Sequence, residues 1–113
     1  MIEKIEIKEL IFSQNEILIT IDIVNNQITY IKNNIIIKDE KYYLNDKNIT
    51  DLIKEYITYW DNEYIDNTIV DGIKTELNIF TNKEILTYKF INKYPHNYNI
   101  FISNLKRMVN ITW

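Results

Sequence analysis

One stretch of the chain, residues 55–73, combines negative charge with aromatic side chains and contains no lysine or arginine. Its acids are Glu55, Asp61, Glu63, Asp66 and Asp71. Aromatic side chains supply much of the contact energy in protein interfaces, and acids speed association with a basic partner. The chemistry available to this stretch is therefore recognition of another protein. The candidate partner-binding residues are Tyr59, Asp61, Glu63, Tyr64, Asp66 and Asp71.

The aromatic residues of this stretch divide into two groups by their spacing. Tyr56 and Trp60 continue an apolar helical stripe that begins earlier in the chain, so we expect them in the core. Tyr59 and Tyr64 lie off that stripe and are better candidates for exposure. The alternative interpretation, which the sequence leaves open, is a solvated loop whose aromatic rings all pack inward.

The residue types that carry most enzymatic chemistry are scarce. There is no cysteine, and His96 is the only histidine, with no nucleophile motif beside it. Gly72 is the only glycine, which excludes a glycine-rich phosphate loop. Residues 61–66 look superficially like a calcium loop, but Ile65 stands where an oxygen ligand belongs. We therefore expect a non-enzymatic protein with no catalytic residue, no metal site and no cofactor.

Charge is unevenly distributed along the chain. Residues 1–73 carry a net charge of −7 and residues 74–113 carry +4, which gives −3 for the 113 residues. This acidic balance argues against direct binding of nucleic acid, which normally requires a basic surface. The first residues do not form a secretory signal, and no apolar run approaches the ~20 residues of a membrane helix. These features favour a cytoplasmic protein without membrane association.

The composition also indicates a source. The chain has 25 Ile, 16 Asn and 12 Lys but no Ala. Core packing does not require that bias, because alanine and valine fill cores as well as isoleucine does. Codons of an AT-rich genome favour Ile, Asn, Lys and Tyr, so a low-GC bacterium or one of its phages fits.

The elements that must position the candidate residues follow from hydrophobic periodicity. Alternating β-branched residues over 17–24 predict a strand, and similar patterns occur in other segments. The further expected strands are 5–12, 28–31, 35–38, 42–44, 73–80 and 85–91. With a single glycine, asparagine must occupy most positive-φ turn positions. Residues 61–68 are expected to form a loop.

The period changes to that of a helix in two places. From Ile49 to Trp60 the apolar residues recur every three or four positions, which predicts a helix over 49–60 with Asn48 as its N-cap. The same spacing predicts a second helix over 97–110, after the loop around Pro95. The expected fold is a single α+β domain, 1–113, in which an antiparallel sheet of about five to six strands carries both helices on one face.

The turn from Asn92 to Tyr98, which reads Asn-Lys-Tyr-Pro-His-Asn-Tyr, precedes the second helix. It resembles an Asn-x-Tyr-Pro-x-Asn-aromatic turn in small uncharacterised bacterial and phage α+β domains. Trp60 and the pair Asp71-Gly72 fit the same pattern. The resemblance covers about the last half of the chain. It implies the fold and no particular activity.

These features lead to one main functional hypothesis. A small, acidic, aromatic-rich protein without catalytic parts fits an inhibitor that occupies the surface of a larger bacterial effector. The expected partner is a larger protein with a basic surface, such as a nuclease. An anti-CRISPR-like phage inhibitor and a toxin immunity protein both fit.

Two alternatives stay open. Sixteen acids could supply a carboxylate-dependent hydrolase with two close carboxyl groups. An unprotected sheet edge could instead make the chain an accessory oligomerisation domain, and it leaves a homodimer open.

Overall fold

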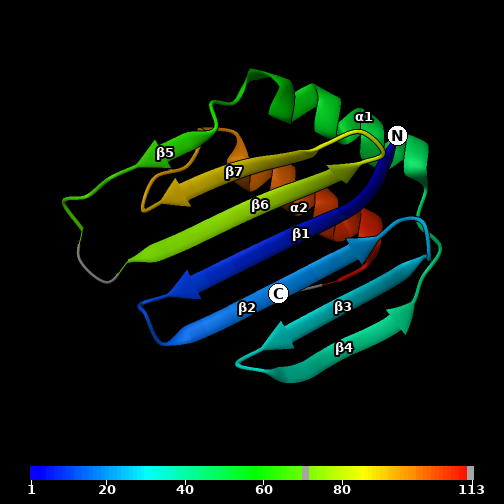
Figure 1. Cartoon of the computed structure of the whole chain (residues 1–113), viewed down its shortest axis with the longest axis horizontal. Helices are drawn as coiled ribbons and strands as arrows, with labels where there is room; N and C mark the ends of the chain where they lie inside the picture. The colour runs from blue at the N-terminus through cyan, green and yellow to red at the C-terminus, as the bar shows by residue number, and fades with distance from the viewer. Residues whose placement is uncertain (70–71, 112–113) are drawn as a thin grey trace.

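The computed structural model describes residues 1–69 and 72–111, which form one seven-stranded sheet and two α-helices. The strands are β1 (Ile2–Ile11), β2 (Asn15–Asp22), β3 (Gln27–Lys32), β4 (Ile35–Lys41), β5 (Glu63–Ile65), β6 (Ile73–Thr81) and β7 (Ile85–Ile91). Their order across the sheet is β4-β3-β2-β1-β6-β7-β5 (Figure 1). All neighbours are antiparallel except β5 and β7, which are parallel. The α+β class is therefore confirmed, with seven strands instead of five to six.

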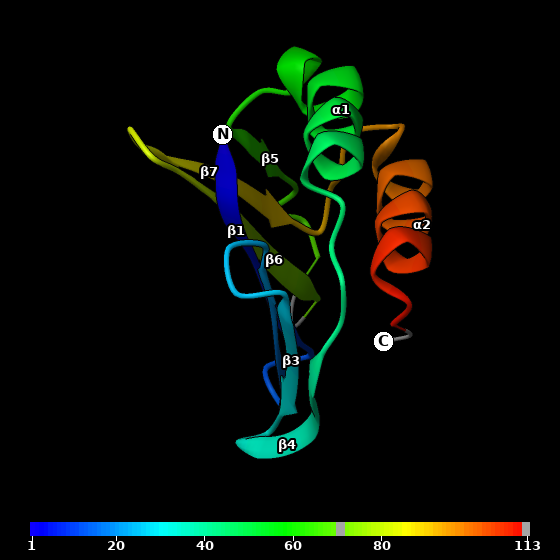
Figure 2. The same cartoon turned by 90° about the vertical axis from the view of Figure 1, so that its right-hand side faces the viewer.

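Both helices cover the same face of the sheet, as Figure 2 shows. Helix α1 (Asp46–Tyr56) continues into a short 3-10 turn (Ile57–Tyr59), and α2 (Tyr98–Val109) lies beside it. None of the helices in the described part of the chain is long and apolar enough to cross a membrane.

The strands bury every second residue against the helices. Ile5 and Ile7 of β1, and Ile19 and Ile21 of β2, have no exposed surface. The residues between them point to the other side of the sheet, which we call the open face because no helix covers it (Figure 2). This alternation is typical of an antiparallel sheet with one solvated face.

Asparagine occupies most of the positive-φ positions, as the glycine-poor sequence predicts; the exceptions in the described residues are Phe12 and Ser13, in the turn between β1 and β2. Asn26, Asn33, Asn34 and Asn92 all have positive φ, and Asn110 ends α2 in the left-handed conformation. Asparagine tolerates this region better than other residues that carry a Cβ atom. The chain can therefore turn sharply at these sites without glycine.

Several predicted element boundaries need correction; the strand predicted over 17–24, for example, is β2 over 15–22, and the one predicted over 5–12 is β1 over 2–11. Helix α1 begins earlier than 49, because the Asn45 side chain, and not that of Asn48, is the cap and accepts a hydrogen bond from the Asn48 amide. Its α-helical part ends at Tyr56. Helix α2 covers 98–109 instead of 97–110. Residues 42–44 are not a strand, and the expected loop 61–68 contains β5.

An aromatic cluster holds α2 on the sheet. Trp60 lies at its centre, with ring centroids 5.3 Å from Phe101 and 5.8 Å from Phe90. The indole Nε1 donates a hydrogen bond of 2.7 Å to Asn97 Oδ1, at the start of α2. The expectation that Trp60 belongs to the core is confirmed, and this residue fixes where the chain leaves α1 towards β5.

Candidate protein-binding surface

Residues 55–65 of the acidic stretch run from the end of α1 to the outer edge of the sheet (Figure 1). Tyr59, in the 3-10 turn, is 83% exposed. Asp61 and Glu63 are exposed as well, and Glu63 begins β5, the edge strand. The fold therefore brings three of the six candidate residues together on one exposed edge.

The structure gives Tyr64 a different environment from the one expected. Its side chain is half-buried, with its ring centroid 5.8 Å from that of Phe90. Its hydroxyl oxygen accepts a hydrogen bond of 3.2 Å from the Asp61 amide. The expectation of an exposed ring is wrong for this residue, because β5 pairs with β7 and turns alternate side chains inward. The hydrogen bond ties the backbone at Asp61 to the Tyr64 side chain.

Asp66 mainly shapes its own loop. Its carboxylate accepts hydrogen bonds from the Thr68 hydroxyl (2.6 Å) and the Thr68 amide (3.0 Å). These bonds stabilise the charged form and lower the pKa of Asp66. The sixth candidate, Asp71, lies outside the described residues.

The exposed acids of this edge have no cationic partner within ion-pair distance. Among residues 1–69 and 72–111, the ion pairs are Lys8–Glu6 and Lys38–Glu40, both on other strands. Glu63 stands beside Lys89 of β7 in the strand register, yet the two do not form an ion pair. We call Tyr59, Asp61 and Glu63 the acidic edge. It offers negative charge and one aromatic ring to solvent.

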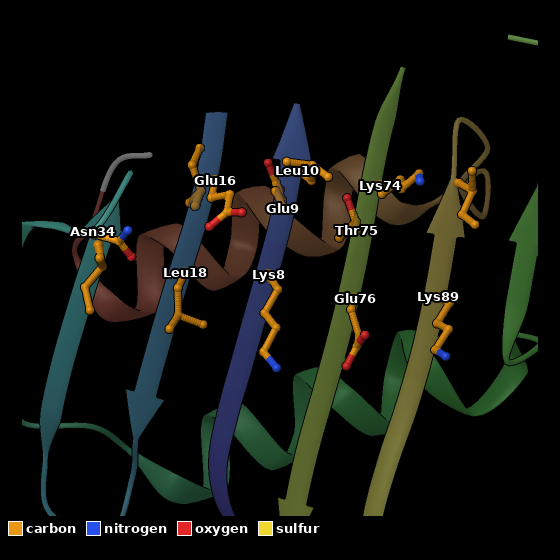
Figure 3. A pocket seen from close by; sticks show the side chains of 13 residues that line it. Lys8, Glu9, Leu10, Glu16, Leu18, Asn34, Lys74, Thr75, Glu76 and Lys89 are labelled. Atoms are coloured by element: carbon orange, nitrogen blue, oxygen red, sulfur yellow. The ribbon is translucent and has the colours of Figure 1, made fainter. Parts of the chain in front are cut away.

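The open face carries a feature that the sequence analysis missed, a hollow of about 580 Å³ (Figure 3). Lys8, Lys74 and Lys89 line it together with glutamates and with apolar residues. One row of register partners crosses all seven strands there, in the order Ile36, Ile31, Leu18, Lys8, Glu76, Lys89 and Glu63. Three apolar residues form one end of the row, and charges of alternating sign form the rest. Such alternation stabilises neighbouring strands on a solvated face.

Metal ligands do not gather in the described structure. Within residues 1–69 and 72–111, no three acids or histidines lie close enough together to hold a metal ion.

A second feature missed by the sequence analysis is a half-buried acid on the helix-covered side. Burial raises the pKa of Glu9, although the positive charge of Lys106 on α2 partly offsets this effect. Nearby, the hydroxyl groups of Thr75 and Tyr94 form a hydrogen bond of 2.8 Å. Burial also raises the pKa values of Tyr94 and Tyr98. The position of Glu9 in the alternating pattern places it inward, where sequence patterning favours an apolar residue.

Glu9→Gln is expected to stabilise the protein at neutral pH. Folding raises the pKa of Glu9, so the folded state is disfavoured once the carboxyl group ionises. The contribution of Glu9 to the free energy of unfolding is therefore most favourable below the unfolded pKa and is lost as pH rises through the folded pKa. At pH 7 the variant should unfold with a free energy higher by about 0.5 kcal/mol, a discounted figure because the carboxylate is partly solvated. At pH 4 the two proteins should have nearly equal free energies of unfolding. Urea denaturation at both pH values measures the difference, and a variant less stable at pH 7 would contradict it.

Comparison of the chain with known protein families, with curated proteins and with solved structures found no match. The geometry of the surface is therefore the basis on which a function is proposed.

Proposed function

We propose that this chain is a non-enzymatic binding protein that inhibits a larger bacterial effector by occupying a basic surface on it. The observation that carries the proposal is the acidic edge, where Tyr59, 83% exposed, is followed within four positions by two exposed carboxylates that form no ion pair with any residue the structure describes. Tyrosine supplies a large contact area at a small cost in conformational entropy, which is why it is enriched at binding surfaces.

The charges support the same role. Carboxylates that are not held in an ion pair remain available to a cationic partner, which they attract over about one Debye length, ~8–10 Å at physiological salt. A basic groove that normally receives nucleic acid would have this complementary charge. The acidic edge would then compete with the phosphate groups for the same lysines and arginines, and a nuclease or a toxin is the kind of effector that we infer.

Reversing the charge of the acidic edge tests this function. The chain is immobilised and exposed to lysate of the bacterium in which it acts, at about 50 mM and about 500 mM salt, so that screening separates electrostatic from other capture. We expect a protein that is retained at low salt and released at high salt. Asp61→Lys combined with Glu63→Lys should reduce its retention at least tenfold, about 1.4 kcal/mol.

The matched control makes the same charge change elsewhere. Asp39 and Glu84 are also exposed, on β4 and in the turn after β6. Asp39→Lys combined with Glu84→Lys should leave retention within about twofold, because neither residue belongs to the acidic edge. If no protein is retained at low salt, or if both double variants lose it equally, the acidic edge is not the binding surface.

A further inference from the structure

Strand β4 forms the free edge of the sheet at the end opposite β5. Its first three residues, Ile35, Ile36 and Ile37, are 65%, 61% and 58% exposed. Three adjacent isoleucines on an unpaired edge are unusual, because such an edge invites pairing with another strand. The apolar surface and the unpaired edge occur at the same place.

The apolar surface does not end at the edge strand. On the open face, Ile36 stands beside Ile31 of β3, and Ile31 stands beside Leu18 of β2. Ile31 and Leu18 line the hollow of the open face, where Leu18 is seen in Figure 3. The row of three apolar residues therefore leads from the hollow to the unpaired edge.

We propose that a second copy of this chain pairs with the first through β4, antiparallel, with Ile36 of each copy opposite its counterpart. This arrangement continues the row as Leu18, Ile31 and Ile36 of one copy followed by Ile36, Ile31 and Leu18 of the other. The two seven-stranded sheets then form one sheet. Apolar cross-strand pairs of this kind stabilise antiparallel sheets.

Apolar matching selects this register, and charge disfavours most of the others. A two-fold axis perpendicular to the sheet keeps open-face side chains opposite open-face side chains. On β4 these are Ile36, Asp39 and Lys41, the register partners of Ile31, Thr29 and Gln27. Other registers of these residues place Ile36 opposite a charged residue, or place Asp39 or Lys41 opposite its own counterpart. The register that pairs Asp39 with Lys41 satisfies charge but leaves Ile36 opposite no residue of β4. Like charges in directly opposite positions destabilise a strand pair.

The strength of this pairing has a structural limit. The β3–β4 register shifts between Tyr30 and Ile31, which leaves Ile37 as an extra residue on β4. Such a bulge interrupts regular pairing, so the new interface is confined to the beginning of β4. Pairing over so few residues makes a small interface, and small interfaces are typical of transient complexes. We therefore expect dimers at roughly 0.1–1 mM chain, and the acidic edge at the far end of the sheet stays uncovered.

Sedimentation equilibrium over that concentration range tests for the dimer. The mass should rise from 13.7 kDa towards twice that value. Ile36→Lys, which places two lysines opposite each other, should stay monomeric. The control is Ile85→Lys, because Ile85 is similarly exposed at 58% but lies on β7; it should dimerise like the parent chain. A monomeric parent, or a dimer that survives Ile36→Lys, overturns the proposal.

Disulfide formation tests the register. The chain has no cysteine, so Ile36→Cys introduces a single thiol per copy. Directly opposite residues bring their Cβ atoms to about 4.5–5.5 Å, close to the separation that a disulfide needs. With oxidised glutathione, Ile36→Cys should form covalent dimers at least tenfold faster than Asp39→Cys, whose thiols would be several residues apart. Equal rates, or faster linkage at residue 39, would contradict this register.

Discussion

Trp60→Ala is expected to lower the free energy of unfolding by roughly 3–5 kcal/mol, the range for truncating a buried tryptophan or phenylalanine. Trp60 is 8% exposed. Its ring centroid lies within 6.2 Å of those of Tyr88, Phe90, Tyr98 and Phe101. Removing the indole would leave a cavity among β7, α2 and the end of α1. Because small domains are stable by only about 5–15 kcal/mol, a large part of the stability would be lost.

Trp60→Phe separates packing from hydrogen bonding in this cluster. It keeps a ring but removes Nε1–H, which donates to Asn97 Oδ1 at the start of α2. We expect a smaller loss of about 1–2 kcal/mol, from one hydrogen bond and the reduced volume. Urea denaturation followed by far-ultraviolet circular dichroism measures both variants without relying on Trp60 fluorescence. A loss below about 1 kcal/mol for Trp60→Ala would show that the cluster does not hold α2 on the sheet.

Gly72→Ala is expected to lower the free energy of unfolding by about 2–4 kcal/mol, although replacing glycine by alanine stabilises a protein where the backbone and the space allow it. A Cβ atom at residue 72 would overlap the side-chain amide of Asn92. Both the oxygen and the nitrogen of that amide form hydrogen bonds. Asn92 Oδ1 accepts a hydrogen bond of 2.7 Å from the Ile73 amide, and Nδ2 donates to the carbonyl oxygens of Asp66 and Ile69. Moving Asn92 away would leave these backbone groups without their partner.

A double-mutant cycle tests this explanation. Asn92→Gly removes the obstructing side chain and preserves the positive φ of residue 92. In that background Gly72→Ala should cost less than about 0.5 kcal/mol, because nothing remains for the new Cβ atom to displace. Unfolding free energies of the four proteins give the coupling between the two sites. If the effects of the two substitutions on the free energy of unfolding are strictly additive, glycine is required at residue 72 for another reason.

The sequence predicts best where one residue pattern decides one element. Alternation from Ile17 onward identifies β2 and the face that it buries, because the side-chain period of a strand is two. The stripe from Ile49 to Trp60 identifies α1 and places the indole in the core. In both cases the signal is local, since the residues that create the pattern also form the element.

Strand β5 has no such signal. Its three residues, Glu63, Tyr64 and Ile65, are too few for periodicity, and they pair with β7, more than 20 residues away in sequence. The same pairing turns Tyr64 inward, so the exposure of the candidate residues depended on it. Glu9 was missed for a related reason: the burial of its carboxylate depends on the elements that pack around it, which come from other parts of the chain.

The sequence by itself determined the α+β class, the two helices, the turns that asparagine can make and the acidic, aromatic character of residues 55–73. Tertiary structure decided which of those residues are exposed, that Gly72 makes room for Asn92, and that three isoleucines remain on a free edge. The physical reason is the separation along the sequence over which each effect acts. Periodicity and turn preference act between neighbouring residues, whereas burial and edge position depend on strands and helices that meet only after the chain has folded.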